Sequence, residues 1–108
     1  MIHFTAEQEK LGLIRTDSEK GKLFGLTSDR FTDDSYLWLE GDTLWLSMLI
    51  SLKEHRGYVL NILTKAKAKG YNIACCPVSE RMKMILSRFG FEIREDCWYY
   101  NNQIKHEL

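Results

Sequence analysis

The sequence predicts a single small α/β domain of the α+β type, with a mixed sheet around a central βαβ unit. Two apolar runs, 43–52 and 71–76, flank an amphipathic stretch at 58–69, which is the pattern of two parallel strands joined by a helix. A chain of 108 residues, 44% hydrophobic and 28% charged, can bury one core but not two. We therefore treat 1–108 as one domain, with a short helical part first and short strands last.

The N-terminal third carries weak signals. Thr5 and Gln8 have the spacing of a capping box, which predicts a helix over residues 6–15. Residues 16–35 contain two glycines and an Asp-Asp-Ser cluster, so we expect loops there around one or two helical turns at most.

A hairpin follows. Residues 36–40 and 43–52 are rich in aromatic and aliphatic side chains and are separated by Gly41-Asp42, a common turn pair. Because the second run is apolar at most positions, we expect it to be a central strand covered on both faces.

The central unit continues with a helix over 58–69 and a strand over 71–76. The apolar residues of the helix fall on one face: Val59, Ile62, Leu63 and Ala66. In such a unit, ligands bind at the carboxyl ends of the parallel strands, so we look for a site after residues 52 and 76.

The C-terminal part begins with a second amphipathic helix, Ser79 to Phe89, which Gly90 ends. Residues 91–94 and 97–100 then read as two strands joined by a turn at Glu95-Asp96.

The net charge is zero, but it is unevenly distributed. Residues 43–90 sum to +6, between flanks of −4 for residues 1–42 and −2 for residues 91–108. A basic segment indicates an anionic partner, most commonly a phosphate, although a solvated helix face would give the same count. Nucleic acid ranks last among the partners, because the lysines at 65, 67 and 69 lack interleaved aromatic residues.

Other features narrow the class of protein. No apolar run approaches the roughly 20 residues that span a bilayer, and no secretory signal is visible, so we expect a cytoplasmic protein without membrane contact. In that compartment Cys75, Cys76 and Cys97 do not predict disulfides. Neighbouring cysteines on a strand point to opposite faces, and the histidines lack ligand spacing, so we expect no metal site.

The order of these elements resembles the GNAT superfamily of N-acetyltransferases over about residues 43–103. The closest part is Ser79 to Phe91, a small polar residue, an apolar helix and a Gly-Phe pair. The run Leu52-Lys-Glu-His-Arg-Gly57 resembles the strand end and phosphate loop of that family. The resemblance implies a GNAT-like mixed sheet and a coenzyme site between the two parallel strands.

Acetyl-CoA and an amine acceptor, either a small molecule or a protein, are the partners that the resemblance implies. Strand backbone would bind the pantetheine arm, and the start of the following helix would bind the pyrophosphate. The residues expected to contact the coenzyme are Leu49, Ile50, Ser51, Leu52, His55, Arg56, Gly57, Tyr58, Val59, Leu60 and Ser79.

Three positions depart from the family pattern, two in the phosphate loop and one in the later helix. With Arg56 in the first place of the phosphate loop, Val59 and Asn61 stand where glycine or alanine is usual, and their side chains are expected to crowd the phosphates. Leu86 stands four residues before Gly90, where many members have a tyrosine that protonates the leaving thiolate.

Cys76, Ser79 and Tyr99 are the candidate substitutes for that catalytic acid, and His55, Glu40 or a water chain could act as the base. The rival interpretation is a degenerate GNAT fold that binds or inhibits a partner without catalysis. Because the N-terminal part is short for the family, a homodimer that covers the exposed surface is a further expectation.

Overall fold

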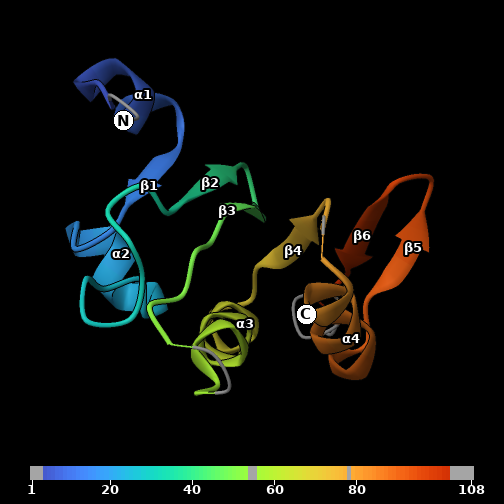
Figure 1. Cartoon of the computed structure of the whole chain (residues 1–108). Coiled ribbons are helices and arrows are strands. Elements are labelled where there is room, and N and C mark those ends of the chain that lie inside the picture. The colour runs from blue at the N-terminus through green and yellow to red at the C-terminus, as the bar shows by residue number, and fades with distance from the viewer. Residues whose placement is uncertain (1–3, 54–55, 78, 103–108) are drawn as a thin grey trace.

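The computed structural model describes residues 4–53, 56–77 and 79–102, which form four helices and a six-stranded sheet (Figure 1). The helices are α1 (Ala6–Leu11), α2 (Glu19–Phe24), α3 (Tyr58–Ala68) and α4 (Glu80–Phe89). The strands are β1 (Leu13–Arg15), β2 (Tyr36–Glu40), β3 (Thr43–Met48), β4 (Asn72–Cys75), β5 (Glu92–Arg94) and β6 (Cys97–Tyr100).

The strands lie in the order β1-β2-β3-β4-β6-β5. Only β3 and β4 are parallel among these pairs, and α3 connects them, whereas every other neighbouring pair is antiparallel. The predicted α+β class is confirmed, and so is the central βαβ unit.

The N-terminus differs from the prediction in one respect. The capping box forms, since the Thr5 side chain accepts from the Gln8 backbone and the Gln8 side chain accepts from the Thr5 N–H. However, the helix expected over residues 6–15 ends at Leu11, and residues 13–15 form edge strand β1. Gly12 explains the change: it adopts φ +140°, and a Cβ there would collide with the Leu39 carbonyl. The chain turns at this glycine to pair with β2.

Helices α2, α3 and α4 all lie on one face of the sheet (Figure 1). The predicted apolar face of α3 is confirmed, because Val59, Ile62, Leu63 and Ala66 are all buried. They pack against strand residues that point the same way, among them Leu37, Leu44, Leu46, Ile73 and Cys75. This layer forms the hydrophobic core.

The opposite side, here called the open face, has no such helical layer among the described residues. In β3, Leu44 and Leu46 are buried against the helices, whereas Trp45 is half-buried and Ser47 is exposed. The expectation that residues 43–52 are covered on both faces is therefore wrong, and the strand ends at Met48. Trp45 is the one aromatic residue of this run, and it lies on the face that is partly open to water.

Leu86 of α4 is fully buried in the core, whereas Met84 on the same helix is 53% exposed. Replacing Leu86 by Ala should lower the free energy of unfolding by about 2–4 kcal/mol, because a cavity remains in the core. Met84→Ala should cost less than about 1 kcal/mol. Urea denaturation of both variants checks this, and equal losses would contradict the packing of α4 described here.

Candidate functional site

The two parallel strands separate at their carboxyl ends. Strand β3 pairs with β4 from Thr43 opposite Asn72 to Trp45 opposite Ala74, and the pairing stops there although β3 runs on to Met48. On its other side, β3 still pairs with β2 as far as Met48. The chain after Trp45 thus follows β2 and leaves β4, which opens the sheet at this point.

The N-terminal loop holds the departing chain in place. Thr32 N–H donates to the Ile50 carbonyl at 3.0 Å, and Leu52 N–H donates to the Arg30 carbonyl at 2.8 Å. Ile50 N–H donates to Ser35 Oγ at 2.9 Å, and Ser35 is fully buried. We call these three hydrogen bonds the 30–35 tether.

The tether fixes which backbone groups face the gap. In an extended chain, alternate residues direct their N–H and C=O groups to opposite edges. Because Ile50 and Leu52 bond to the N-terminal loop, the backbone groups of Leu49 and Ser51 point toward the edge that β4 has left. The N–H and C=O groups of these two residues can therefore hydrogen-bond a ligand in the gap.

A cleft of about 900 Å³ occupies this gap, within the usual size range of small-molecule sites. We call it the main cleft. The segment after β3 and the start of α3 contribute Leu49, Ile50, Ser51, Lys53, Arg56, Gly57, Tyr58, Val59 and Leu60. The start of α4 and the helix itself contribute Ser79, Arg81, Met82, Met84, Ile85, Arg88 and Phe89.

The lining of the main cleft is basic and apolar at once. Its charged side chains are Lys53, Arg56, Arg81 and Arg88, and the described lining includes no carboxylate. Ile50, Leu60 and Met84 line it although each is about half exposed. Such a lining suits a ligand that has both an apolar chain and an anionic end.

The first turn of α3 adds a backbone anion site to this lining. Its N-cap, Gly57, has the left-handed φ of +73°, and no side chain caps the helix. The first intrahelical donor is Asn61 N–H, which donates to the Gly57 carbonyl. The amides of Tyr58, Val59 and Leu60 precede it, so they and the helix dipole can bind an anion.

Val59 and Asn61, the two residues of this loop that depart from the family pattern, occupy different environments. Asn61 Oδ1 accepts from Arg30 Nη1 at 3.0 Å, and Asn61 is not part of the cleft lining. The expected crowding at this position is therefore wrong, because the side chain turns toward the N-terminal part. Val59 lines the cleft but is largely buried in the core.

The structure brings together all the residues predicted to contact the coenzyme except Leu52 and His55. Leu52 is half exposed and lies outside the cleft lining, and His55 lies outside the described residues. Sequence reasoning missed Lys53 and the whole contribution of α4 beyond Ser79. Arg81 and Arg88 are seven residues apart, or two helical turns, and this spacing could have placed both on one face.

Of the three candidate acids, only Ser79 lines the main cleft. Its Oγ caps α4 by accepting from Met82 N–H at 3.1 Å. Tyr99 lies on the open face, where its ring contacts Trp45, and Glu40 lies on that face too. Leu86, at the position of the family's tyrosine, is a core residue.

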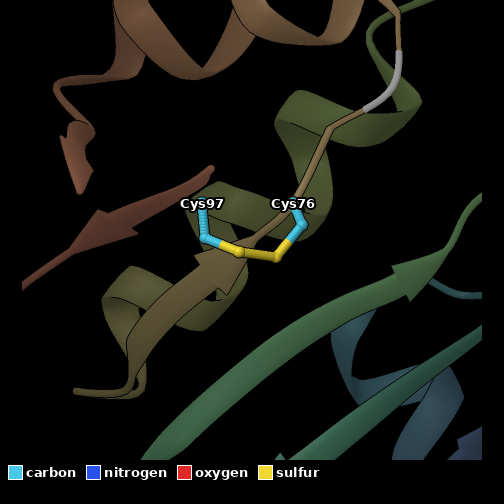
Figure 2. Close-up of a disulfide and its surroundings, with 2 residues drawn as sticks. All are labelled: Cys76 and Cys97. Atoms are coloured by element: carbon cyan, nitrogen blue, oxygen red, sulfur yellow. A yellow bond between two sulfur atoms is a disulfide. The ribbon is translucent and has the colours of Figure 1, made fainter. Parts of the chain in front are cut away.

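Cys76, the third candidate, forms a disulfide with Cys97 (Figure 2). The expectation that the cysteines form no disulfide is wrong. Antiparallel pairing places Cys75 opposite Trp98, so the next pair along the strands is Cys76 and Cys97. In this form Cys76 has no thiol proton to donate.

Cys75 is a free thiol that points to the helical side of the sheet. Burial raises the pKa of Cys75 to about 11, so it stays protonated at neutral pH. Disulfides are rare in the cytosol, and the cytoplasmic location remains a prediction.

In the described ranges, no group of histidine, cysteine and acidic side chains could hold a metal ion. No described helix has the length and apolar character needed to cross a bilayer. Comparison of the chain with protein-family models, curated proteins and solved structures gives no match in any of the three.

The tether makes the first prediction for this site. Ser35→Ala removes the acceptor of the buried Ile50 N–H and should lower the free energy of unfolding by about 1–3 kcal/mol. Ser87→Ala, at an exposed position of α4, should change it by less than about 0.5 kcal/mol. Chemical denaturation of both variants gives the two values; a Ser35→Ala protein as stable as the Ser87→Ala control would contradict the tether.

The cysteines make a second prediction. Without reductant, iodoacetamide at pH 8 should label the folded protein negligibly, because burial raises the pKa of Cys75 to about 11 and keeps its thiol protonated. After mild reduction, Cys76 and Cys97 should be labelled and Cys75 should not. Peptide mass spectrometry locates the labels. Rapid labelling of Cys97 before reduction would show that the disulfide is absent.

Proposed function

We propose that the main cleft binds acetyl-CoA and that the protein transfers the acetyl group to an amine. The observation that carries this proposal is the set of four cationic side chains that line the main cleft, Lys53 and Arg56 before α3 and Arg81 and Arg88 on α4, where two parallel strands separate. The resemblance of residues 43–103 to GNAT acetyltransferases points to the same ligand.

Each part of the coenzyme has a complementary part of the cleft. The first-turn amides of α3 and the Arg56 side chain would hold the pyrophosphate. Backbone groups of Leu49 and Ser51 would hydrogen-bond the amides of the pantetheine arm, and apolar side chains of α4 would pack against its methylene groups. When bound, acetyl-CoA supplies an acetyl group activated as a thioester.

In the transfer, the neutral amine nitrogen forms a bond to the acetyl carbon and the C–S bond breaks. The nitrogen gives up one proton to a base or to water, and the leaving thiolate takes one proton. Ser79 is the candidate for delivering that proton, since it lines the cleft and an Oγ that accepts one hydrogen bond can still donate its own. The thiolate can also take a proton from solvent.

A second function, coenzyme binding without catalysis, has its own support. Tyr99 lies on the open face, Cys76 is held in a disulfide, and the position of the usual catalytic tyrosine is core residue Leu86. The arrangement for binding an anion is thus better developed than the arrangement for proton transfer.

Calorimetric titration with CoA and acetyl-CoA tests the binding. We expect both to bind, and Arg56→Ala to weaken binding by about tenfold, because a charge-assisted phosphate contact is lost. Lys69→Ala is the matched control, since Lys69 lies at the far end of α3 and outside the cleft, and it should change affinity by less than about twofold. No heat with either ligand at high concentration would overturn the proposal.

Turnover separates the two functions. Mass spectrometry of CoA released from acetyl-CoA, with a panel of small amines and lysine peptides, should detect acetylated product if the protein is a transferase. Tight binding with release no faster than in buffer would favour the binding protein. The variant Ser79→Ala should slow transfer by about 10–100-fold if its hydroxyl is the acid, with coenzyme affinity little changed.

A further inference from the structure

The open face carries a second hollow whose character is opposite to that of the main cleft. Its volume is about 410 Å³, and it lies over β1, β2 and β3 beside α1. Its lining consists of Phe4, Gln8, Leu13, Tyr36, Trp38, Glu40, Trp45 and Ser47. Among the described residues of this lining, Glu40 is the single charged side chain, and none is a lysine or arginine. We call it the aromatic hollow.

Aromatic side chains make up half of the lining. Trp38 and Trp45 are direct cross-strand partners, and both are half-buried, so part of each indole remains exposed on the open face. Tyr36 meets Phe4 edge-on with ring centroids 5.5 Å apart. Large aromatic surfaces of this kind offer negative π-faces to a ligand.

A smaller hollow of about 200 Å³ adjoins the first and has the same chemistry. It shares Glu40 and Trp45 with the aromatic hollow and is otherwise lined by neutral residues, including Tyr99 and Asn72. Trp45 contacts Tyr99 edge-on at 6.0 Å. One carboxylate and one indole therefore lie at the boundary of two hollows, with no cation among the described lining of either.

Two arginines stack on rings that line these hollows, and each also pairs with a carboxylate. Arg94 lies over the Tyr99 ring of the smaller hollow at 5.8 Å and pairs with Glu92 at 3.8 Å. Arg15 lies over the Phe4 ring at 5.3 Å and pairs with Glu9 at 3.8 Å. Arg15 is not part of the hollow's lining. The carboxylate of Glu40 thus sets the sign of the charge in the aromatic hollow, and it repels phosphates and other anions.

We propose that the aromatic hollow binds a protonated organic amine. Glu40 supplies the countercharge, and the faces of Trp38 and Trp45 supply cation–π attraction and an apolar wall for the alkyl part. A neutral ligand would make no use of the carboxylate. An alkylammonium ion uses both parts of the lining, and alkyl amines such as the lysine side chain are protonated at neutral pH.

The position of the hollow connects it to the main cleft. Ser47 lines the aromatic hollow and Leu49 lines the main cleft, two residues further along the same extended chain, or about 7 Å. The hollow thus extends along β3 toward the place where the strands separate, and a ligand amine held at Glu40, opposite Thr43, would lie at its hairpin end. Its role as the acetyl acceptor rests on the proposed function, whereas its binding does not depend on the coenzyme.

The test uses n-butylammonium chloride as the probe and n-butanol as its neutral counterpart, without coenzyme. The indole N–H signals of the full chain are followed by NMR at constant ionic strength. We expect saturable shifts of the Trp38 and Trp45 signals with butylammonium, little shift of Trp98, which packs against the core, and at least about fivefold weaker binding of butanol.

Variants locate the interaction. Glu40→Gln should weaken butylammonium binding by about fivefold or more, and Trp45→Leu by about threefold, because the countercharge or a π-face is lost. Glu19→Gln is the matched control: it removes the same charge from α2, on the helical side of the sheet, and should leave the affinity unchanged. Thermal unfolding of each variant verifies that it is folded.

Equal affinity of Glu40→Gln and the original chain would overturn the proposal, as would butanol binding as tightly as butylammonium. A doubled molar mass in sedimentation, with Trp45 shielded from both probes, would also overturn it, because a second copy would then cover the open face. If the chain binds butylammonium but not CoA, this inference stands and the proposed function is overturned.

Discussion

The position of one short backbone segment determines the main cleft. The N-terminal loop bonds to Ile50 and Leu52 along one edge of this segment, while the ladder with β4 on the other edge stops at Trp45, so the backbone groups of Leu49 and Ser51 face the main cleft. Ser35 makes this arrangement stable because it is buried and satisfies the Ile50 N–H. The Thr16 side chain in turn donates to the carbonyls of Thr32 and Ser35, which ties the loop to the residue after β1. A loop without an obvious chemical pattern thus shapes the site.

The sheet also separates two regions of opposite charge. The basic middle of the sequence supplies the start of α3 and the exposed side of α4, which meet at the main cleft. The acidic N-terminal part supplies Glu40 to the open face. An anionic coenzyme on one side and a cationic acceptor on the other would each meet a field of the suitable sign. Zero net charge for the chain as a whole conceals this division.

Local signals predicted the elements that local physics determines. The capping box at Thr5, the apolar face of α3 and the stop at Gly90 were predicted correctly, because each depends on neighbours within one or two turns. The first helix ends at Leu11 and not at Arg15, because Gly12 approaches Leu39 closely. This is a tertiary contact, which local sequence signals do not reveal. The prediction that β3 is covered on both faces was wrong for a related reason. Trp45 lies on the open face, but an aromatic residue there looks like a core residue in the sequence.

The site was predictable in part. The loop at Arg56-Gly57 and the helix after it could be located from the order of the elements, but the cations of α4 could not, because their convergence on that loop depends on how α4 packs. The disulfide was missed because Cys76 and Cys97 become neighbours only when β6 lies beside β4. Tyr99 lies outside the main cleft because side chains alternate along a strand, so that Tyr99 and Tyr100 point to opposite faces of the sheet.

The most direct test of the account is backbone-amide NMR of the full chain during titration with CoA, because it locates the ligand residue by residue. Binding at the separated strands predicts that the largest shifts fall on Leu49–Ser51 and Gly57–Leu60, while the indole signals of Trp38 and Trp45 stay in place. Large shifts on the open face with an unchanged first turn of α3 would contradict it.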